Sequence, residues 1–246
     1  MNVIKGQKAI QTYYDKYYLD EHKDYFTASR AAQEVNFLIE SLSKKPHSVC
    51  DVGCGDGRHL KVFQQLGIPN GLGIDLSNQL VKQAKKNVND SNFTIQNQSF
   101  ADWQPEHECY DITYCIFSSF SYCRDLSEAQ NLITKMVSAT TMEGIICVDI
   151  DNVFRLVRFL TEHNKKAEDT DELEFDAINL HLLAREKRGR AVLESSTQYF
   201  MAPEIKTLFA TAGIKNSNLV FKGGFNKDKY SYRSDRLIVI AKKQDK

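Results

Sequence analysis

The sequence of 246 residues lacks a charge excess, a long hydrophobic run and a proline-rich linker. Lys and Arg total 32, and Asp and Glu also total 32. No global positive field therefore exists to attract a nucleic acid, and such a partner is disfavoured. The longest apolar stretches, such as Gly144 to Ile150, fall far short of the roughly 20 residues that cross a bilayer. Only four prolines occur and no repeat divides the chain, so we expect a single domain over 1–246.

Paired cysteines and an export signal are also missing. None of the six cysteines forms a CxxC pair, the spacing typical of zinc and redox motifs, and we expect no metal site. The polar N-terminal stretch has no hydrophobic segment like that of a secretory signal. We therefore predict a cytoplasmic protein with buried, reduced thiols and no membrane partner. The sequence leaves the oligomeric state open.

The sequence does contain enough apolar residues for a sizeable core, with 42% hydrophobic and 11% aromatic residues. Apolar residues at three- and four-residue steps predict a helical region over 7–42, which Pro46 ends. From Ser48 onward, short runs rich in β-branched residues alternate with amphipathic stretches, a pattern typical of an α/β protein with a mostly parallel sheet. We place strands at 48–53, 71–76, 93–98, 110–117 and 144–150, and helices at 57–66, 77–89 and 126–141. Ser77 and Ser127 are the predicted N-caps of the last two helices.

After Asp151 the alternation ends. A helical segment near 152–164 precedes two long runs, 173–185 and 191–200. The link between them is charged and holds Gly189, which predicts an antiparallel hairpin. Pro203 opens a helix that ends at Gly213, and two strands near 217–223 and 236–242 follow.

The segment from Asp51 to Arg58 carries the clearest functional signal. Glycines after a buried strand permit a tight turn and let backbone N–H groups approach a ligand. Dinucleotide-binding loops use G-x-G-x-x-G, whereas the spacing here is G-x-G-x-G, and Arg58 stands where the third dinucleotide glycine would be. Asp51 adds a negative charge that would repel a pyrophosphate and attract an ammonium or sulfonium. The alternative is a plain tight turn.

A second acidic residue follows the glycine loop, and the number of residues between them indicates a role in ligand binding. Asp75 ends the second predicted strand and lies 18 positions after Gly57. This offset is close to the roughly 20 residues at which a carboxylate accepts the hydroxyls of an adenosine ribose. A helix N-cap is the alternative role. Taken together with the glycine loop, the ribose role is favoured.

These motifs resemble those of class I S-adenosylmethionine-dependent methyltransferases of the small-molecule type. The segment 51–57 is similar to the family's glycine loop, Asp75 to its ribose-binding acid, 110–115 to its fourth-strand motif, and 142–145 to the turn before its fifth strand. The resemblance implies a Rossmann-like seven-stranded sheet with helices on both faces and a last strand antiparallel to its neighbours. It also implies S-adenosyl-L-methionine bound over the carboxyl ends of strands one, two and four.

The resemblance assigns cofactor contacts to Asp51, Gly53, Cys54, Gly55, Asp75, Leu76, Ser99, Phe100, Phe117 and Ser118. One departure concerns the adenine end. The family commonly has an acid after strand three, whereas the most natural alignment puts Ser99 there and Phe100 against the adenine ring. A hydroxyl accepts a weaker hydrogen bond than a carboxylate does. Phe100 and Trp103 could instead be core aromatics.

On the acceptor side, the loop after strand four (117–122) and the end of strand five are expected to face the methyl group. Tyr14, His181 and Asp151 are the candidate catalytic residues, and His163 is a further histidine near the expected pocket. The N-terminal helix carries Tyr13, Tyr14, Tyr17 and Tyr18, which either help to close the pocket or pack against the sheet edge. Arg233 and Arg236 either bind a substrate carboxylate or form a surface pair with Asp235, and the surface pair is favoured.

The sequence therefore predicts a methyltransferase that acts on an N, O or other nucleophile of a small metabolite. An RNA or protein methyltransferase and a non-catalytic cofactor-binding subunit are the alternatives. Within the single domain we expect an N-terminal helical lid (1–45), a cofactor-binding core (48–150), a substrate-side insertion with an antiparallel hairpin (151–202) and a C-terminal helix with two strands (203–246).

Overall fold

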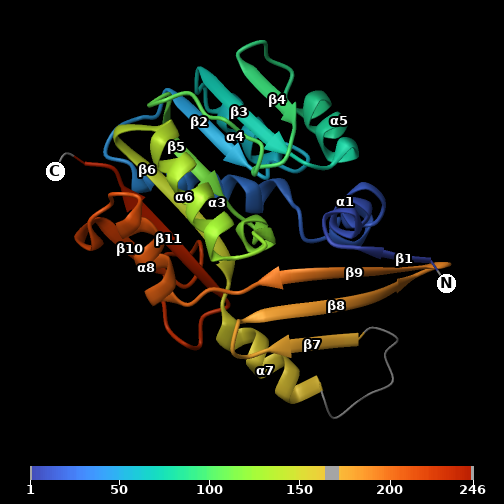
Figure 1. Ribbon diagram of the computed structural model, residues 1–246. Coiled ribbons are helices and arrows are strands. Elements are labelled where there is room, and N and C mark those ends of the chain that lie inside the picture. Colours follow the sequence, from blue (N-terminus) through green and yellow to red (C-terminus); the bar gives the residue numbers. More distant parts are fainter. Residues whose placement is uncertain (1, 164–171, 245–246) are drawn as a thin grey trace.

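The computed structural model of the protein describes residues 2–163 and 172–244. Two separate sheets organise them (Figure 1). The larger sheet has seven strands in the order β10-β11-β6-β5-β2-β3-β4. These strands are β2 (Ser48–Val52), β3 (Asn70–Asp75), β4 (Phe93–Asn97), β5 (Tyr110–Cys115), β6 (Thr140–Asp151), β10 (Leu219–Lys222) and β11 (Arg236–Lys242).

The strand directions confirm the predicted sheet. Strands β4, β3, β2, β5 and β6 are parallel, and β11 runs antiparallel to both β6 and β10. Parallel strands need crossover connections, and helices provide those from β2 to β3, from β3 to β4 and from β5 to β6, whereas the segment 98–109 between β4 and β5 is irregular. Parallel order also places the carboxyl ends of β2, β3 and β5 at one edge, which is where ligands bind in open α/β sheets.

Helices cover both faces of this sheet, and alternate residues of β2 enter different cores. Cys50 and Val52 pack with α6 (Leu126–Ala139) and α8 (Ala202–Thr211). Val49 packs with α3 (Ala28–Ser41), α4 (Arg58–Gln65) and α5 (Asn78–Asn87) on the opposite face. A strand that is buried on both faces usually has a nearly continuous apolar sequence, and in β2 only Ser48 and Asp51 are polar. The six cysteines are free thiols, and all but Cys109 are buried.

The predicted helical region over 7–42 is divided into three helices. These are α1 (Gln7–Lys16), α2 (Tyr18–His22) and α3. Thr27 has an extended backbone, and its side chain accepts a hydrogen bond from the backbone N–H of Arg30, so a new helix begins there. Ser77 caps α5 as predicted. The predicted cap at Ser127 is wrong, because Asp125 accepts the backbone N–H of Glu128 at 2.8 Å.

The smaller sheet holds the predicted hairpin. Its strands are β1 (Asn2–Lys5), β7 (Glu172–Asp176), β8 (His181–Arg188) and β9 (Ala191–Gln198), in the order β1-β9-β8-β7. Strands β8 and β9 are antiparallel, as expected. The run 173–185 is not one strand, because Asp176 accepts the backbone N–H groups of Ile178 and Asn179 and Leu180 adopts a positive φ of 53°. The chain turns there and adds β7 as a third antiparallel strand.

The N-terminal segment joins the two sheets. Strand β1, which the sequence did not predict, pairs in parallel with β9. Helix α1 follows it and contacts both β9 and α5 (Figure 1). Helix α7 (Val153–His163) packs under the smaller sheet through Val153 and Leu156. Residues 164–171 of the predicted insertion lie outside the described part.

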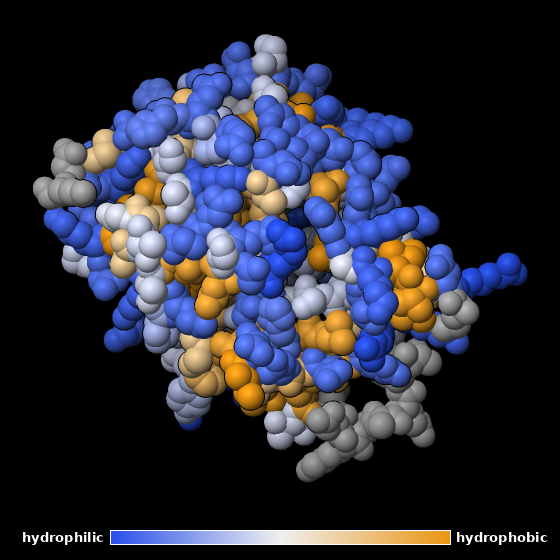
Figure 2. All heavy atoms as spheres, viewed as in Figure 1, coloured by the Kyte–Doolittle hydropathy of each residue, from blue (hydrophilic) through white to orange (hydrophobic). Residues whose placement is uncertain are grey.

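The surface facing the viewer in Figure 2 is hydrophilic over most of its area, and a group of hydrophobic residues lies over α7. Phe154 and Val157 are exposed there. Among the helices of the described residues, we find none with the length and apolar character that a bilayer crossing requires.

Candidate active site

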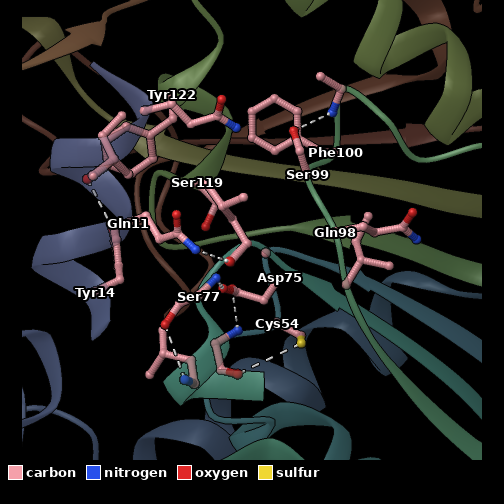
Figure 3. Close-up of a pocket in the computed structure, with 18 of the residues that line it drawn as sticks. Gln11, Tyr14, Cys54, Asp75, Ser77, Gln98, Ser99, Phe100, Ser119 and Tyr122 are labelled. Atoms are coloured by element: carbon pink, nitrogen blue, oxygen red, sulfur yellow. Dashed lines mark hydrogen bonds between the residues drawn. The ribbon is translucent and has the colours of Figure 1, made fainter. Parts of the chain in front are cut away.

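A cavity of about 420 Å³ lies at the carboxyl ends of β2, β3 and β5 (Figure 3). The glycine bend after β2 with the start of α4, the end of β3 with the start of α5, the loops after β4 and β5, and helices α1 and α2 line it, together with single residues of α6 and β9. Small-molecule sites usually measure about 300–1,000 Å³. The cavity therefore has the size and the position in the sheet that a bound small molecule needs.

The glycine bend is open on one side and closed on the other. Gly53 and Gly55 both have positive φ values, 82° and 55°. A Cβ atom built on Gly53 would lie 2.6 Å from Oγ of Ser119, so the loop after β5 closes that side. A Cβ atom built on Gly55 would meet no atom of the described part of the chain within 4 Å, although Gly55 lines the cavity. The bend therefore presents backbone to free space at Gly55.

Asp75 lies beside this bend and lines the cavity. One carboxylate oxygen accepts the backbone N–H of Gly55 at 2.9 Å, and the other accepts that of Ser77 at 2.8 Å (Figure 3). Burial raises the pKa of Asp75, and these two N–H donors oppose the rise. A carboxylate has about four acceptor positions, so it can still accept hydrogen bonds from a ligand.

Asp51 is buried beneath the bend rather than in the cavity wall. Its carboxylate is only 1% exposed, and neither oxygen has a hydrogen-bond partner among residues 2–163 and 172–244. Burial raises the pKa of Asp51 to about 8, an effect that Tyr114 and Arg58 partly offset. An unpartnered buried carboxylate is costly, so this position favours a nearby cation.

His59 lines the cavity and was missed by the sequence analysis. Its Nε2 atom lies 2.8 Å from Oε2 of Glu34, and its Nδ1 atom lies 4.0 Å from Oδ2 of Asp51. Glu34, on α3, also accepts a hydrogen bond from Nε of Arg30 at 2.9 Å. Burial lowers the pKa of His59, which favours the neutral imidazole. Nothing in the local sequence marks Glu34 as its partner, because the two residues come from different helices.

Helix α1 is bonded to the cavity wall through three polar side chains. The hydroxyl of Tyr14 donates to that of Tyr122 at 3.0 Å, and Nε2 of Gln11 donates to the carbonyl oxygen of Leu76 at 3.3 Å (Figure 3). Asp15 accepts the Ser77 hydroxyl at 2.6 Å and the backbone N–H of Gln79 at 3.1 Å. Helix α1 is thus bonded directly to the residues that follow β3.

The four N-terminal tyrosines divide between the two roles considered for them. Tyr14 and Tyr18 line the cavity. Tyr13 and Tyr17 face the smaller sheet, where the guanidinium carbon of Arg188 lies 5.9 and 5.6 Å from their ring centroids. Such distances fit cation–π contacts. The segment therefore packs against the smaller sheet and also closes over the cavity.

Most of the predicted cofactor contacts converge on this cavity: Gly53, Cys54, Gly55, Asp75, Leu76, Ser99, Phe100 and Phe117 all line it. Trp103 does not, because it is buried in the core with α6. Ser99 uses its hydroxyl oxygen to accept the backbone N–H of Ala101 at 3.1 Å. Tyr14 is the candidate catalytic residue that the structure brings into the cavity.

Besides Asp51, three predicted site residues lie outside the cavity wall: Ser118, Asp151 and His181. Phe117 and Ser118 both have positive φ values, 57° and 60°, which turn the Ser118 hydroxyl toward Asp151 at 3.0 Å. Ser119 lines the cavity in its place. His181 pairs with Gln198 within the smaller sheet. His163 is the last residue of α7, and its side chain is outside the described part.

Arg236 is not the surface residue that the sequence favoured. Its guanidinium donates to both oxygens of Asp149 at 2.7 and 2.9 Å and to Asp151 at 2.7 Å. It also donates to Oγ of Ser118 at 3.0 Å. Arg233 does remain at the surface, against the ring of Tyr232. Neither arginine therefore forms the predicted surface pair with Asp235. The guanidinium groups that pair with Asp235 belong to Arg155 and Arg158 on α7.

The chain shows similarity to known proteins over this region. Residues 49–144 match a family model described as a methyltransferase domain. Over 137 residues the chain is 26% identical to a dTDP-3-amino-3,4,6-trideoxy-alpha-D-glucopyranose N,N-dimethyltransferase from Streptomyces venezuelae. That match covers 55% of this chain and 54% of the relative. The chain thus spans about half the length of the curated relatives that it matches.

Two solved structures share the fold over nearly the whole chain. The CcbJ methyltransferase from Streptomyces caelestis has a TM-score of 0.68 and 16% identity, covering 88% of this chain and 96% of that one. CalS10 from Micromonospora echinaspora, an amino pentose methyltransferase solved with S-adenosylmethionine bound, has a TM-score of 0.60 and 15% identity, covering 93% and 96%. At these identities the likeness concerns the fold.

Proposed function

The chain carries a methyltransferase domain of the class I, S-adenosylmethionine-dependent fold, and from this premise we propose that it methylates a nucleophilic atom of a small metabolite. S-adenosylmethionine is the cofactor of this domain. The observation that carries the proposal is a single cavity that includes both Asp75 with the glycine bend and the half-buried tyrosines of α1 and the loop after β5. A donor and an acceptor can therefore meet within one space.

The residues around the bend fit the cofactor. We assign the ribose hydroxyls to Asp75, whose carboxylate retains acceptor capacity, and the methionyl part to the open backbone at Gly55. Asp51 lies beneath the bend, and a cation bound nearby, such as an ammonium or sulfonium, would favour the ionised form of its carboxyl group. Leu76, Ser99 and Phe100 would surround the adenine ring.

When bound, the cofactor supplies a methyl group on a positively charged sulfur. The chain's own part is to hold the acceptor in line with that group and to exclude water. Burial raises the pKa values of Tyr14 and Tyr122, so both stay neutral and act as hydrogen-bonding groups rather than bases. They orient the acceptor, and Ser119 and Phe117 complete the wall beside it.

An amine nitrogen on a sugar-like metabolite is the acceptor that we favour. One curated relative is an N,N-dimethyltransferase of an amino sugar nucleotide, and one structural neighbour is an amino pentose methyltransferase. Tyrosine rings and hydroxyls suit a polar organic ring, because they offer flat apolar faces and hydrogen bonds together. The balanced charge of the chain gives no support to a nucleic-acid acceptor.

A labelling experiment tests the acceptor class. Purified protein is incubated with methyl-labelled S-adenosylmethionine and, separately, a small-metabolite extract, total tRNA and lysate protein. We expect the label in the amine-containing metabolite fraction. Label in tRNA or protein would contradict the small-molecule proposal, and label in no pool would favour a non-catalytic subunit.

The cofactor assignment is tested by Asp75→Asn. Loss of the charged acceptor removes hydrogen bonds worth about 1.5–3 kcal/mol, so calorimetry should show S-adenosylmethionine binding about 10- to 150-fold more weakly. Asp90→Asn is the matched control, because Asp90 also accepts the backbone N–H two residues ahead but lies away from the cavity. Equal affinities of the two variants would remove Asp75 from the cofactor site.

We also propose that the N-terminal segment acts as a lid. Asp15 fastens α1 to the start of α5, and Gln11 and Tyr14 reach across the cavity. The other side of the segment is held by β1, which pairs with β9. Opening the cavity at α1 therefore requires that these hydrogen bonds and the ring contact between Tyr14 and Tyr122 break.

Asp15→Ala tests the lid. Loss of a capping interaction of about 1 kcal/mol should speed the release of S-adenosylmethionine about fivefold in stopped-flow measurements, while the chain stays folded. Asp20→Ala is the control, because Asp20 is an exposed acid on the neighbouring helix α2. A lid is ruled out if both variants release the cofactor at the wild-type rate.

A further inference from the structure

Three buried ionisable side chains, which we call the proton network, lie in contact beneath the glycine bend. Glu34 comes from α3, His59 from α4 and Asp51 from β2, and their side chains are 2%, 3% and 1% exposed. Nε2 of His59 lies 2.8 Å from Oε2 of Glu34, and Nδ1 of His59 lies 4.0 Å from Oδ2 of Asp51. His59 also lines the cavity, so the network borders the space assigned to the cofactor.

The hydrogen bonds of Glu34 indicate which nitrogen of His59 carries a proton. Oε1 of Glu34 accepts Nε of Arg30 at 2.9 Å, and a guanidinium partner favours the ionised carboxylate. An ionised carboxylate only accepts hydrogen bonds, so we assign the proton of His59 to Nε2, which donates to Glu34. A neutral imidazole has one N–H group, and Nδ1 therefore presents a lone pair toward Asp51.

Asp51 therefore needs a proton of its own in the chain without a ligand. An ionised Asp51 would face the lone pair of Nδ1, and neither of its oxygens has a hydrogen-bond partner within residues 2–163 and 172–244. Such a buried carboxylate is costly, and protonation removes the charge. Burial raises the pKa of Asp51 to about 8 and lowers the pKa of His59, so the proton belongs on Asp51 rather than on Nδ1.

The other ionisable groups around Asp51 leave this need in place. Arg58 on α4 attracts the ionised form, but its guanidinium is paired with Asp56, at 3.4 Å. Asp56 and Asp75, at the end of β3, oppose ionisation of Asp51. Arg58 and Asp56 act on His59 as well. Burial raises the pKa values of the remaining groups near Asp51, which stay neutral: Tyr114, Cys50 and Cys54.

We propose that the proton network holds one proton in the free chain and releases it when a cationic ligand binds at the glycine bend. The O–H bond of Asp51 breaks, the proton passes by way of Nδ1 of His59 into the cavity and then to the solvent, and the carboxylate remains as a counter-charge. The inference rests on the proposed function, because that function brings a cation to the bend. The cofactor carries two cationic groups, an ammonium and a sulfonium, and either charge favours an ionised carboxyl.

Release of a proton makes the affinity for the cofactor depend on pH. The pKa of Asp51 is then lower in the complex than in the free chain, so binding strengthens as pH rises toward the free value of about 8. Below about pH 7 the ammonium of the cofactor stays largely protonated itself. Between pH 6 and pH 7 we therefore expect calorimetry to show an affinity for S-adenosylmethionine that rises about three- to tenfold.

Calorimetry of the wild-type chain in two buffers with different heats of ionisation counts the protons directly. At about pH 6.5 we expect about 0.5–1 proton to be released for each S-adenosylmethionine bound. The demethylated form, S-adenosylhomocysteine, keeps the ammonium and lacks the sulfonium. Release with both ligands assigns the effect to the ammonium, and release with S-adenosylmethionine alone assigns it to the sulfonium. Binding of S-adenosylmethionine without proton release overturns the proposal.

Asp51→Asn locates the proton. This variant should bind S-adenosylmethionine without proton release and with the same affinity at pH 6 and pH 7. Asp111→Asn is the matched control, because Asp111 is a buried acid near the start of the neighbouring strand β5 and pairs with Lys44 at 3.0 Å. Burial raises the pKa of Asp111, but the backbone N–H of His47 and the ammonium of Lys44 outweigh that effect and lower it. The control should keep the wild-type release.

Glu34→Gln is the second variant should Asp51→Asn fail to fold. It removes one negative charge from the network, so Asp51 ionises at a lower pH and less of the proton remains to be released at pH 6.5. Wild-type proton release in Asp51→Asn, or in a folded Glu34→Gln, would place the proton elsewhere and contradict the proposal. Failure of the proposed function is separate, because the wild type would then bind neither ligand at any pH.

Discussion

We expect Gly55→Ala to reduce the affinity for S-adenosylmethionine by about 100-fold or more while the chain stays folded. A Cβ atom at Gly55 would project into free space within the cavity, beside the backbone N–H that Asp75 accepts. Cofactors that lie on a glycine bend approach its backbone closely, so one added carbon atom occupies the position of the ligand. Overfilling a packed site commonly costs about 1–3 kcal/mol, and the cofactor must also shift from Asp75. Calorimetric titration measures the loss.

Gly67→Ala provides the matched control for this variant. Gly67 also has a positive φ, 71°, and a Cβ atom there would likewise meet no protein atom within 4 Å. Both substitutions force alanine into a left-handed conformation, at about 1–2 kcal/mol of folding stability, but only Gly55 lines the cavity. Equal losses of stability with a loss of binding in Gly55→Ala alone would support the assigned site. Unchanged binding in Gly55→Ala would remove the glycine bend from the cofactor site.

The glycine bend and Asp75 could be predicted because the relevant chemistry is local. The order of residues along the chain indicates a buried strand, then glycines that can adopt positive φ, and then an acid at the end of the next strand. Parallel order then brings Gly55 and Asp75 together, 2.9 Å apart between N and Oδ2. The mostly parallel sheet could also be predicted, because short apolar runs alternate with amphipathic stretches along the sequence.

The remaining site features depend on contacts between distant segments, which spacing does not reveal. Glu34 and His59 meet across two helices, and Asp15 reaches the start of α5 across 62 positions. Ser119 lines the cavity where Ser118 was predicted, and this difference has another cause. Phe117 and Ser118 both adopt the left-handed backbone region, which non-glycine residues rarely enter, so the side-chain order expected for an ordinary loop is wrong there.

Such a strained turn must be held by its surroundings, and Arg236 is the residue that holds it. Asp149 accepts the backbone N–H of Phe117 at 2.9 Å, and Ser118 exchanges hydrogen bonds with Asp151 through its hydroxyl. Arg236 donates to both aspartates and to Ser118, from a strand that lies antiparallel to β6. The last strand of the sheet thus positions the loop whose next residue, Ser119, closes the glycine bend.

We expect Arg236→Met to lower the free energy of unfolding by about 3–5 kcal/mol, measured by urea denaturation. Asp149 is 1% exposed, and without Arg236 its carboxylate is left buried without a cation. Burial raises the pKa of Asp149, and Arg236 opposes that rise. A carboxyl whose pKa is higher in the folded state loses stability as pH rises, so the deficit of the variant should be smaller at about pH 5 than at about pH 8.

Two further variants separate the buried charge from ordinary loss of contacts. Arg155 also pairs with Asp151, at 3.1 Å, but is 55% exposed where Arg236 is 17% exposed. Arg155→Met should therefore change stability by no more than about 1 kcal/mol. Adding Asp149→Asn to Arg236→Met removes the uncompensated charge while an amide oxygen can still accept the N–H of Phe117, so much of the lost stability should return. If Arg236→Met is no more destabilising than Arg155→Met, Arg236 does not hold the loop through its buried ion pairs.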